Sequence, residues 1–237
     1  MTRTGRSVLV TGGNRGIGLA IAQDLAAQGD RVAVTYRTAA PPPGLYGVAC
    51  DLTDPDAVAR LFEKVTAEQG PVEVLVANAG IIRDALLLSM SDQDVDEVLD
   101  TNLRAVIRVV KHASRQMLAE RWGRLVLVSS SAAFTGSPGQ TNYAAAKAGL
   151  VGLARSLAWE LGPRGITVNV VSPGLIDTEM TRDLSKARRE QFLSRTPLGR
   201  PGTVEEVAAA VRFLASAEAG YLTGAVVPVS GGLGMGI

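Results

Sequence analysis

The sequence contains few of the residues that form disulfides or bind metal ions. Its 237 residues include one cysteine, Cys50, and one histidine. A single cysteine cannot form a disulfide within the chain and is typical of a reducing compartment, so we expect a cytoplasmic protein. One histidine and the absence of Cys-x-x-Cys spacing exclude the usual zinc ligand sets, and we expect no metal.

Long apolar runs and an excess of either charge are also missing. No stretch approaches the roughly 18 apolar residues of a membrane-spanning helix, and residues 1–6 lead into only a short apolar run, which predicts no secretory signal. Lys and Arg total 24 and Asp and Glu total 23, which gives a net charge of +1. The balance predicts no nucleic-acid partner and no membrane attachment.

The chain does show a regular alternation of short β-branched runs with longer helical patterns. Apolar strands that are each followed by a helix are typical of a parallel sheet covered on both faces. We therefore predict an α/β fold, a doubly wound, Rossmann-like sheet of seven parallel strands in a single domain, 1–237. The charged segment 173–201 is the least regular part of the chain, and we interpret it as a flexible substrate flap with some helix. The predicted strands are 7–11, 31–35, 46–49, 73–77, 125–129, 166–171 and 225–229, and the predicted helices are 18–28, 54–69, 91–122, 140–161 and 203–217.

A glycine-rich turn, Thr11–Gly18, follows the first predicted strand and opens the first predicted helix. Glycines allow a tight turn and let backbone N–H groups approach a pyrophosphate at a helix N-terminus. No Gly-Lys-Ser/Thr follows, so the turn is not a P-loop. The spacing Gly12, Gly16, Gly18 in this context indicates a dinucleotide site, and a turn without any ligand is the alternative.

The type of dinucleotide is indicated about 20 residues further on, where NAD enzymes place an acid that binds the ribose 2′-hydroxyl. This chain has Tyr36-Arg37-Thr38 there, without an acid. Arg37, together with Arg15 in the turn, is suited to pair with a 2′-phosphate. We therefore predict NADP(H), with a solvated strand end as the alternative role for Arg37.

A tyrosine and a lysine, Tyr143 and Lys147, lie four residues apart on a predicted helix and so share one face. Free tyrosine has a pKa near 10, and a neighbouring ammonium favours the phenolate. We therefore expect Lys147 to lower the pKa of Tyr143. Ser130 follows the fifth predicted strand, where open α/β sheets bind ligands, and its hydroxyl is suited to hold a carbonyl oxygen beside Tyr143.

A buried amide is predicted in the longest helix, because Asn102 falls within the apolar stripe of residues 91–122. A buried amide must find hydrogen-bond partners. Two interpretations stay open: a structural amide that ties the helix to a loop, or a residue that holds a water in a proton relay.

Taken together, these motifs resemble the short-chain dehydrogenase/reductase family, through T-G-x-x-x-G-x-G and Y-x-x-x-K and over essentially the whole chain. The resemblance implies a catalytic tetrad of Asn102, Ser130, Tyr143 and Lys147. It also implies cofactor contacts from the glycine turn, from the Asn-Ala-Gly after the fourth strand, from the acid after the third strand, and from the segment that begins Pro-Gly. The implied cofactor residues are Gly12, Asn14, Arg15, Gly16, Ile17, Gly18, Arg37, Asp51, Asn78, Ala79, Gly80, Tyr143, Lys147, Pro173, Gly174, Ile176 and Thr178.

Within this family the chain is similar to reductases of 3-oxoacyl thioesters carried by acyl carrier protein, notably in residues 140–149, 165–169 and 230–235. The resemblance implies NADPH-dependent reduction in type II fatty acid synthesis, with Arg124 and Arg164 docking the acidic carrier. Surface cations without a partner are the alternative for both arginines. Reduction of another ketone (a polyketide, a CoA thioester or a small ketone) and a nucleotide sensor without catalysis remain alternative functions.

Self-association is predicted from the helix that carries Tyr143. This helix, 140–161, is rich in alanine, glycine and leucine and is apolar nearly all round, so one sheet cannot bury it alone. We expect a homo-oligomer through this helix and the helix 91–122. The family resemblance implies a tetramer.

Overall fold

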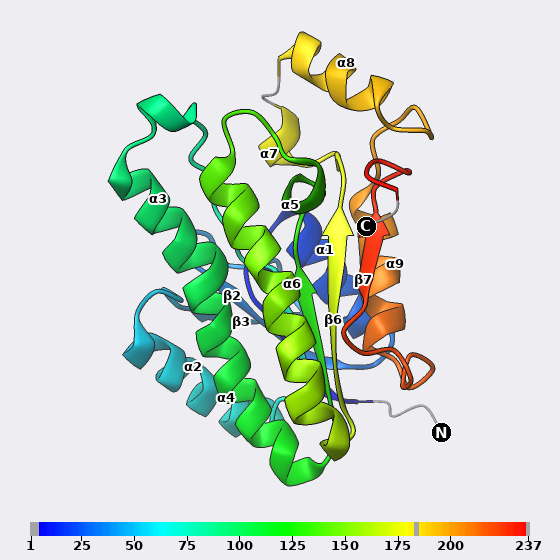
Figure 1. The fold of residues 1–237 in the computed structure, drawn as a ribbon. Helices are drawn as coiled ribbons and strands as arrows, with labels where there is room; N and C mark the ends of the chain where they lie inside the picture. Colours follow the sequence, from blue (N-terminus) through cyan, green and yellow to red (C-terminus); the bar gives the residue numbers. More distant parts are fainter. Residues whose placement is uncertain (1–4, 183–184, 236–237) are drawn as a thin grey trace.

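The computed structural model describes residues 5–182 and 185–235. Residues 1–4, which belong to the N-terminal segment predicted not to be a secretory signal, lie outside the described residues. Seven parallel strands form one sheet in the order β3-β2-β1-β4-β5-β6-β7 (Figure 1). This order reverses direction between β1 and β4, which is where doubly wound folds bind ligands. The predicted fold class is confirmed. The strands are β1 (Ser7–Val10), β2 (Arg31–Tyr36), β3 (Tyr46–Ala49), β4 (Val74–Ala77), β5 (Gly123–Val128), β6 (Ile166–Pro173) and β7 (Val226–Val229).

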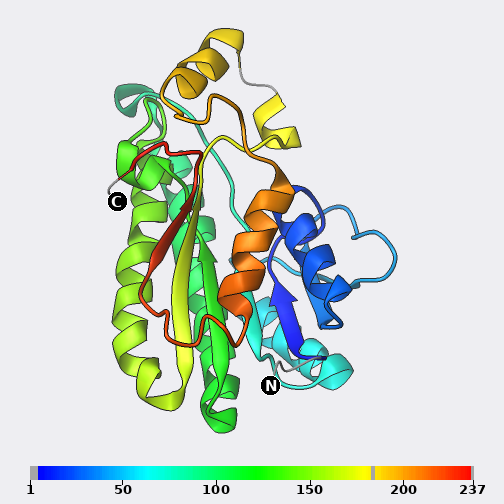
Figure 2. The same ribbon diagram turned by 90° about the vertical axis from the view of Figure 1, so that its right-hand side faces the viewer.

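Helices cover both faces of the sheet, and each face has its own apolar core. One core packs α2, α4 and α6 against the sheet, and the other packs α1 and α9 (Figures 1 and 2). Burial on both faces explains why the central strands are apolar throughout. The main helices are α1 (Gly16–Ala27), α2 (Pro55–Gln69), α3 (Asp92–Leu99), α4 (Ala105–Glu120), α6 (Thr141–Leu161) and α9 (Val204–Ala215). The shorter helices are η1 (Leu87–Ser89), α5 (Ala132–Thr135), η3 (Gly162–Arg164), α7 (Glu179–Arg182) and α8 (Lys186–Ser194).

The long helix predicted over 91–122 is interrupted. A π-helical turn, η2 (Asp100–Arg104), separates α3 from α4, and Arg121 ends α4 in the left-handed conformation with φ 51°. The apolar stripe continues through the turn, so its periodicity gave no sign of the interruption. Asn102 lies within the π turn and is fully buried.

The segment predicted as a flap folds into two short helices above the carboxyl ends of the strands (Figure 2). Helices α7 and α8 lie there, and residues 183–184 between them are outside the described part. Ser185 begins α8 by accepting a hydrogen bond from the Arg188 N–H at 3.3 Å. The helix expected within residues 173–201 is thus present as α7 and α8.

The strand β5 begins at Gly123 rather than at residue 125, which places Arg124 inside the sheet. Arg124 is only 4% exposed and lies over the Trp122 ring at 4.6 Å. It donates to the carbonyls of Ser216 at 3.1 Å and Gly165 at 3.3 Å. Ser216 caps the C-terminus of α9, where a cation is favourable. The expectation that Arg124 docks a carrier protein is therefore wrong, because its buried guanidinium serves the fold.

No helix within residues 5–182 and 185–235 is long and apolar enough to cross a membrane. The same residues contain no group of three or more His, Cys, Asp or Glu side chains placed to hold a metal ion.

Candidate active site

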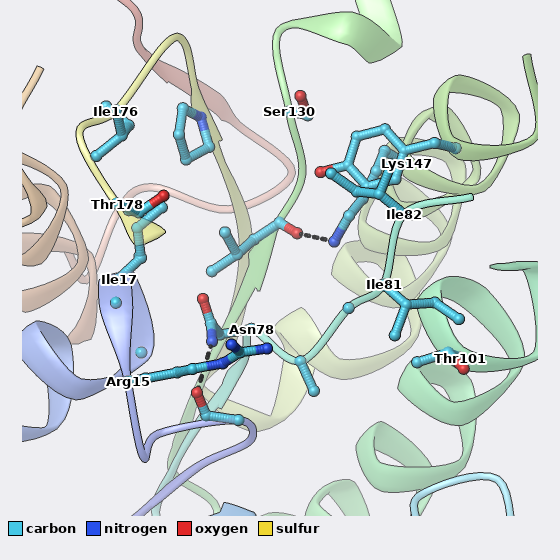
Figure 3. Close-up of a pocket in the computed structure, with 18 of the residues that line it drawn as sticks. Arg15, Ile17, Asn78, Ile81, Ile82, Thr101, Ser130, Lys147, Ile176 and Thr178 are labelled. Carbon is cyan, nitrogen blue, oxygen red and sulfur yellow. Dashed lines mark hydrogen bonds between the residues drawn. The ribbon is translucent and has the colours of Figure 1, made fainter. Parts of the chain in front are cut away.

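One cavity of about 570 Å³ opens at the carboxyl ends of the strands. Every predicted catalytic and cofactor residue except Asn102 lines it, and Figure 3 shows several of them. The chain therefore brings together residues that are up to 166 positions apart, from Gly12 to Thr178. The predicted residues that line the cavity are Gly12, Asn14, Arg15, Gly16, Ile17, Gly18, Arg37, Asp51, Asn78, Ala79, Gly80, Ser130, Tyr143, Lys147, Pro173, Gly174, Ile176 and Thr178.

The glycine turn is held against β4 by close packing and by an amide. A Cβ on Gly18 would lie 2.2 Å from the Gly12 carbonyl oxygen and 2.5 Å from the Asn78 amide nitrogen, so no side chain fits there. The Asn78 amide donates to the carbonyls of Thr11 at 3.1 Å and Gly12 at 3.2 Å, and Figure 3 draws one of these two bonds. Asn78 thus fixes the turn in place as well as lining the cavity.

The N-terminus of α1 faces the cavity without a cap. Arg15 occupies the N-cap position and makes no side-chain cap hydrogen bond, and the first turn carries no acid. The first N–H groups of a helix have no partner inside the helix and attract anions. Gly16 and Ile17 at this end line the cavity, so the predicted pyrophosphate site lies at the N-terminus of α1.

The adenosine end of the predicted site carries balanced charges. Hydrogen bonds from the Thr53 hydroxyl and N–H, together with the nearby Arg37, lower the pKa of Asp51. Arg15 lies 3.8 Å from Glu179, and both side chains are exposed, so this ion pair is weak.

A second cavity, of about 320 Å³, adjoins the first at Arg37. Its lining adds Arg60 and Lys64, so three cations gather beside the adenosine end. The Cys50 thiol lies between the two cavities, and burial together with Asp51 raises its pKa to about 11.

Lys147 is buried one helical turn after Tyr143 on α6. It is 3% exposed, and its ammonium donates to the Val128 carbonyl at 2.8 Å (Figure 3). Burial lowers its pKa to about 8. An ammonium has three donors, and this hydrogen bond uses one of them. The other donors are available to a ligand in the cavity.

The expectation that Lys147 lowers the pKa of Tyr143 is wrong for the chain alone. Burial raises the pKa of Tyr143, a hydrogen bond with Ser130 offsets part of the rise, and the charge of Asp84 adds to it. The Lys147 ammonium is 5.8 Å from the centre of the tyrosine ring and is directed to the backbone of β5. A phenol with a raised pKa stays protonated at neutral pH, which is the state a proton donor needs.

Ser130 is distinguished from its neighbours by its surroundings. The Ser129 hydroxyl is buried and donates to the Lys147 carbonyl at 2.9 Å, and Ser131 is also buried. Ser130 is partly exposed to the cavity and bonded to Tyr143. Its oxygen also accepts from the Ala132 N–H at 3.2 Å, which fixes its rotamer.

Asn102 makes the contacts of a structural amide. Its oxygen accepts from the Ile81 N–H at 2.8 Å, and its nitrogen donates to the Ile81 carbonyl at 2.9 Å. The two bonds tie the π turn to the loop after β4. A Cβ on Gly80 would lie 3.0 Å from the Asn102 oxygen and 3.4 Å from the Lys147 nitrogen, so Asn102 and Lys147 face the same small space. π turns occur often at functional sites.

The segment after β6 forms the far wall of the cavity. The Gly174 N–H donates to the Val229 carbonyl at 3.0 Å, and Ile176 bridges to Gly202. Thr181 accepts from the Thr178 N–H at 3.0 Å, which holds the start of α7 against this wall. Thr178 and Ile176 face the cavity in Figure 3.

Several residues that the motifs did not indicate also line the cavity. Gln140 donates to both carboxylate oxygens of Asp84 at 3.1 Å, which joins the loop after β4 to the start of α6. Arg188 and Phe192 reach the cavity from α8. Gln140 lies only three residues before Tyr143, whereas nothing local in the sequence marks Asp84 or Arg188.

The remaining predicted docking residue, Arg164, is exposed. It lies in η3, after the C-terminus of α6 and just before β6 begins, so it sits at the amino end of β6, whereas the cavity opens at the carboxyl ends of the strands. Arg121, at the end of α4, is also exposed. It lies close to Gly165, the residue after Arg164, because a Cβ added to Gly165 would lie 2.9 Å from the Arg121 carbonyl oxygen.

Comparisons with known proteins agree with this geometry. A family described as "Enoyl-(Acyl carrier protein) reductase" matches residues 12–234. A "3-oxoacyl-[acyl-carrier-protein] reductase MabA" of Mycobacterium avium is 55% identical over 98% of this chain and 91% of its own length. A "3-oxoacyl-[acyl-carrier-protein] reductase FabG" of Escherichia coli K12 is 46% identical over 99% of this chain and all of its own length. Matches of this extent and identity show that the chain belongs to the short-chain dehydrogenase/reductase family of oxidoreductases.

Proposed function

We propose that the protein reduces the ketone of 3-oxoacyl thioesters carried by acyl carrier protein to a 3-hydroxy group, using NADPH, in type II fatty acid synthesis. The observation that carries the proposal is the arrangement of Ser130, Tyr143 and Lys147 in one cavity with the uncapped end of α1. The relatives named as 3-oxoacyl reductases support the choice of substrate.

Each side chain has a task that follows from its surroundings. When bound, the nicotinamide supplies the hydride. The Ser130 hydroxyl donates to the ketone oxygen and orients it. Tyr143, whose phenol is protonated at neutral pH, donates its proton to the same oxygen as negative charge develops there. Proton donation by a positioned acid contributes about 10²–10⁴-fold to a rate.

The other two members of the tetrad prepare this proton transfer. The free N–H donors of Lys147 are placed to hold the ribose hydroxyls, and its positive charge favours the phenolate that remains after Tyr143 has given up its proton. Asn102 holds the Ile81 backbone with both of its side-chain polar atoms. We propose that the π turn around Asn102 also positions a water that returns a proton toward Lys147.

The choice of NADPH over NADH rests on charge. No acid occupies residues 36–38, and three cations, Arg37, Arg60 and Lys64, surround the cavity beside the adenosine end. A 2′-phosphate is doubly charged near neutral pH and gains charge-assisted hydrogen bonds from guanidinium groups. Asp51, which is ionised at neutral pH and whose carboxylate is further favoured by its lowered pKa, is proposed to accept from the adenine amino group.

The partners follow from the substrate and from the surface. The acyl carrier protein delivers the substrate, and Arg164 is the exposed member of the predicted docking pair. We also propose a homotetramer through α6 and α4. Trp159 on α6 is 86% exposed and Ile107 on α4 is 44% exposed. The small residues Ala145, Ala148 and Gly152 of α6 are also exposed and allow a second helix to approach closely. Sedimentation as a monomer at micromolar concentration would contradict this assembly. The free thiol of Cys50 suits a reducing compartment, and we propose the cytoplasm.

The test is the oxidation of NADPH with acetoacetyl thioesters. The substrates are acetoacetyl carrier protein and acetoacetyl-CoA, with NADH as the cofactor control and a crotonyl thioester as the enoyl control suggested by the family description. Fast turnover that prefers NADPH and the carrier-bound ketone is expected. Turnover of the CoA form alone would assign another ketone. Binding of NADPH without reduction of any ketone or enoyl substrate would favour a nucleotide sensor.

A further inference from the structure

Basic residues are concentrated in one part of the flap, which as a whole (173–201) contains six Arg or Lys and four Asp or Glu. Residues 182–195 contain five Arg or Lys and two Asp or Glu, which gives +3 in a chain whose net charge is +1. Arg182, Lys186 and Arg195 are exposed. Among the described residues, none of these three has a carboxylate within ion-pair distance, whereas Arg189 pairs with Asp177 at 2.7 Å. Positive charge that has no ion-pair partner among the described residues therefore gathers at the end of α7, at Arg182, and at the two ends of α8, at Lys186 and Arg195.

The basic helix is also anchored beside the site. Arg188 donates to the Ser137 hydroxyl at 3.1 Å and to the Pro138 carbonyl at 3.2 Å. Ser137 and Pro138 belong to the loop that leads from Ser130 to α6 and Tyr143. On the same side of α8, Arg188 and Phe192 line the cavity, so the helix forms part of its rim. A molecule bound to the outer surface of α8 would lie directly over the entrance.

We infer that the exposed cations of the flap, Arg182, Lys186 and Arg195, are the surface on which the carrier protein docks. The inference rests on the proposed function. An acyl carrier is a small acidic protein that presents its substrate on a phosphorylated arm, so its surface is complementary to this patch. Complementary charges speed association and orient the partner. A carrier protein that docks on these cations needs to extend its substrate-bearing arm only into the adjacent cavity.

The position of Arg164 makes it the weaker candidate for delivery to the same chain. It lies beyond the far end of α6, a helix of 21 residues that begins beside the cavity. At 1.5 Å per residue such a helix is about 30 Å long. A carrier bound at Arg164 would therefore face away from the cavity of its own chain.

The experiment compares two charge reversals on two substrates. The flap variant is the double substitution Lys186→Glu and Arg195→Glu, and the matched control is Arg164→Glu. Each is assayed with NADPH and either acetoacetyl carrier protein or the acetoacetyl thioester of N-acetylcysteamine. The second substrate is small and uncharged, so it reports on the cavity without docking. The wild type is assayed first, because failure to reduce the carrier-bound ketone would contradict the proposed function rather than the docking surface.

The flap variant is expected to raise KM for the carrier substrate about tenfold, because reversal of two rim charges turns attraction of the acidic carrier into repulsion. Its kcat and its KM for the small thioester should stay within twofold of wild type. The KM of wild type for the carrier should rise with salt, and the variant should lose most of that dependence. Arg164→Glu should leave the carrier KM unchanged.

Three outcomes would overturn the inference. A carrier KM that rises only in Arg164→Glu would place docking at the far end of the molecule. A parallel loss on both substrates in the flap variant would show a structural role for these cations. An unchanged carrier KM, together with co-sedimentation of wild type but not of the flap variant with phosphatidylglycerol vesicles, would make the patch a lipid-binding surface.

Discussion

Replacement of Lys147 by methionine should stabilise the fold at neutral pH while it removes activity. Lys147 is 3% exposed, and burial lowers its pKa from 10.5 to about 8. Below pH 8 the folded chain must keep a buried ammonium charged. Each pKa unit corresponds to 1.36 kcal/mol, so a fall of about 2.5 units lowers the free energy of unfolding by about 3 kcal/mol at pH 7. Methionine has a similar volume and carries no charge.

A second contribution reduces this gain. The Val128 carbonyl loses its donor in Lys147→Met, and an unsatisfied buried group costs about 1–2 kcal/mol. The variant should therefore be more stable than wild type by about 1–2 kcal/mol at pH 7. A group with a lowered basic pKa destabilises below its folded pKa, and the penalty is relieved as pH rises from 8 to 10.5. At pH 10 the penalty falls to about 1 kcal/mol, so the advantage should shrink by about 2 kcal/mol.

Urea denaturation at pH 7 and pH 10, without cofactor and at one protein concentration, measures both values. The exposed Lys64 supplies the control, because Lys64→Met removes a charge that is solvated in both states. A variant less stable than wild type at pH 7 would refute the reasoning. So would a stability difference that is the same at both pH values.

Three further substitutions test the site. Tyr143→Phe should abolish ketone reduction while NADPH still binds, as measured by fluorescence titration; full activity would remove Tyr143 from the mechanism. Gly18→Ala should lower the free energy of unfolding by about 1–3 kcal/mol and weaken NADPH binding, because its Cβ would lie 2.2 Å from a backbone oxygen. Gly162→Ala, which meets nothing within 4 Å, is its control, and equal effects of the two would contradict the packing argument. Arg37→Gln should raise KM for NADPH about tenfold or more and leave KM for NADH unchanged, since one charge-assisted hydrogen bond is worth about 1.5–3 kcal/mol; the same selective loss in Arg31→Gln, at the opposite end of β2, would show a general effect of net charge.

The fold and most of the cavity could be predicted because their signals are local. Each of these signals lies within about ten residues of sequence: the turn Thr11–Gly18, the pair Tyr143 and Lys147, and each apolar strand. A parallel sheet then brings the carboxyl ends of its strands to one edge, which is where these motifs meet.

Errors arose where a residue's environment depends on distant chain segments. Arg124 reads as a surface cation, but it meets the C-terminus of α9 and the Gly165 carbonyl. Tyr143 reads as a tyrosine activated by its lysine, but burial dominates its pKa and Lys147 is turned to β5. Asn102 lies in a π turn that the helical periodicity does not reveal.

The sequence by itself therefore determined the fold class, the dinucleotide turn and the residues that gather in the cavity, because periodicity and short motifs act over one or two turns of chain. Only the tertiary structure decided which cations are buried, which protonation states the site favours, and that a basic helix forms the rim of the cavity. Desolvation and charge pairing decide these properties, and both depend on residues that are remote in the sequence.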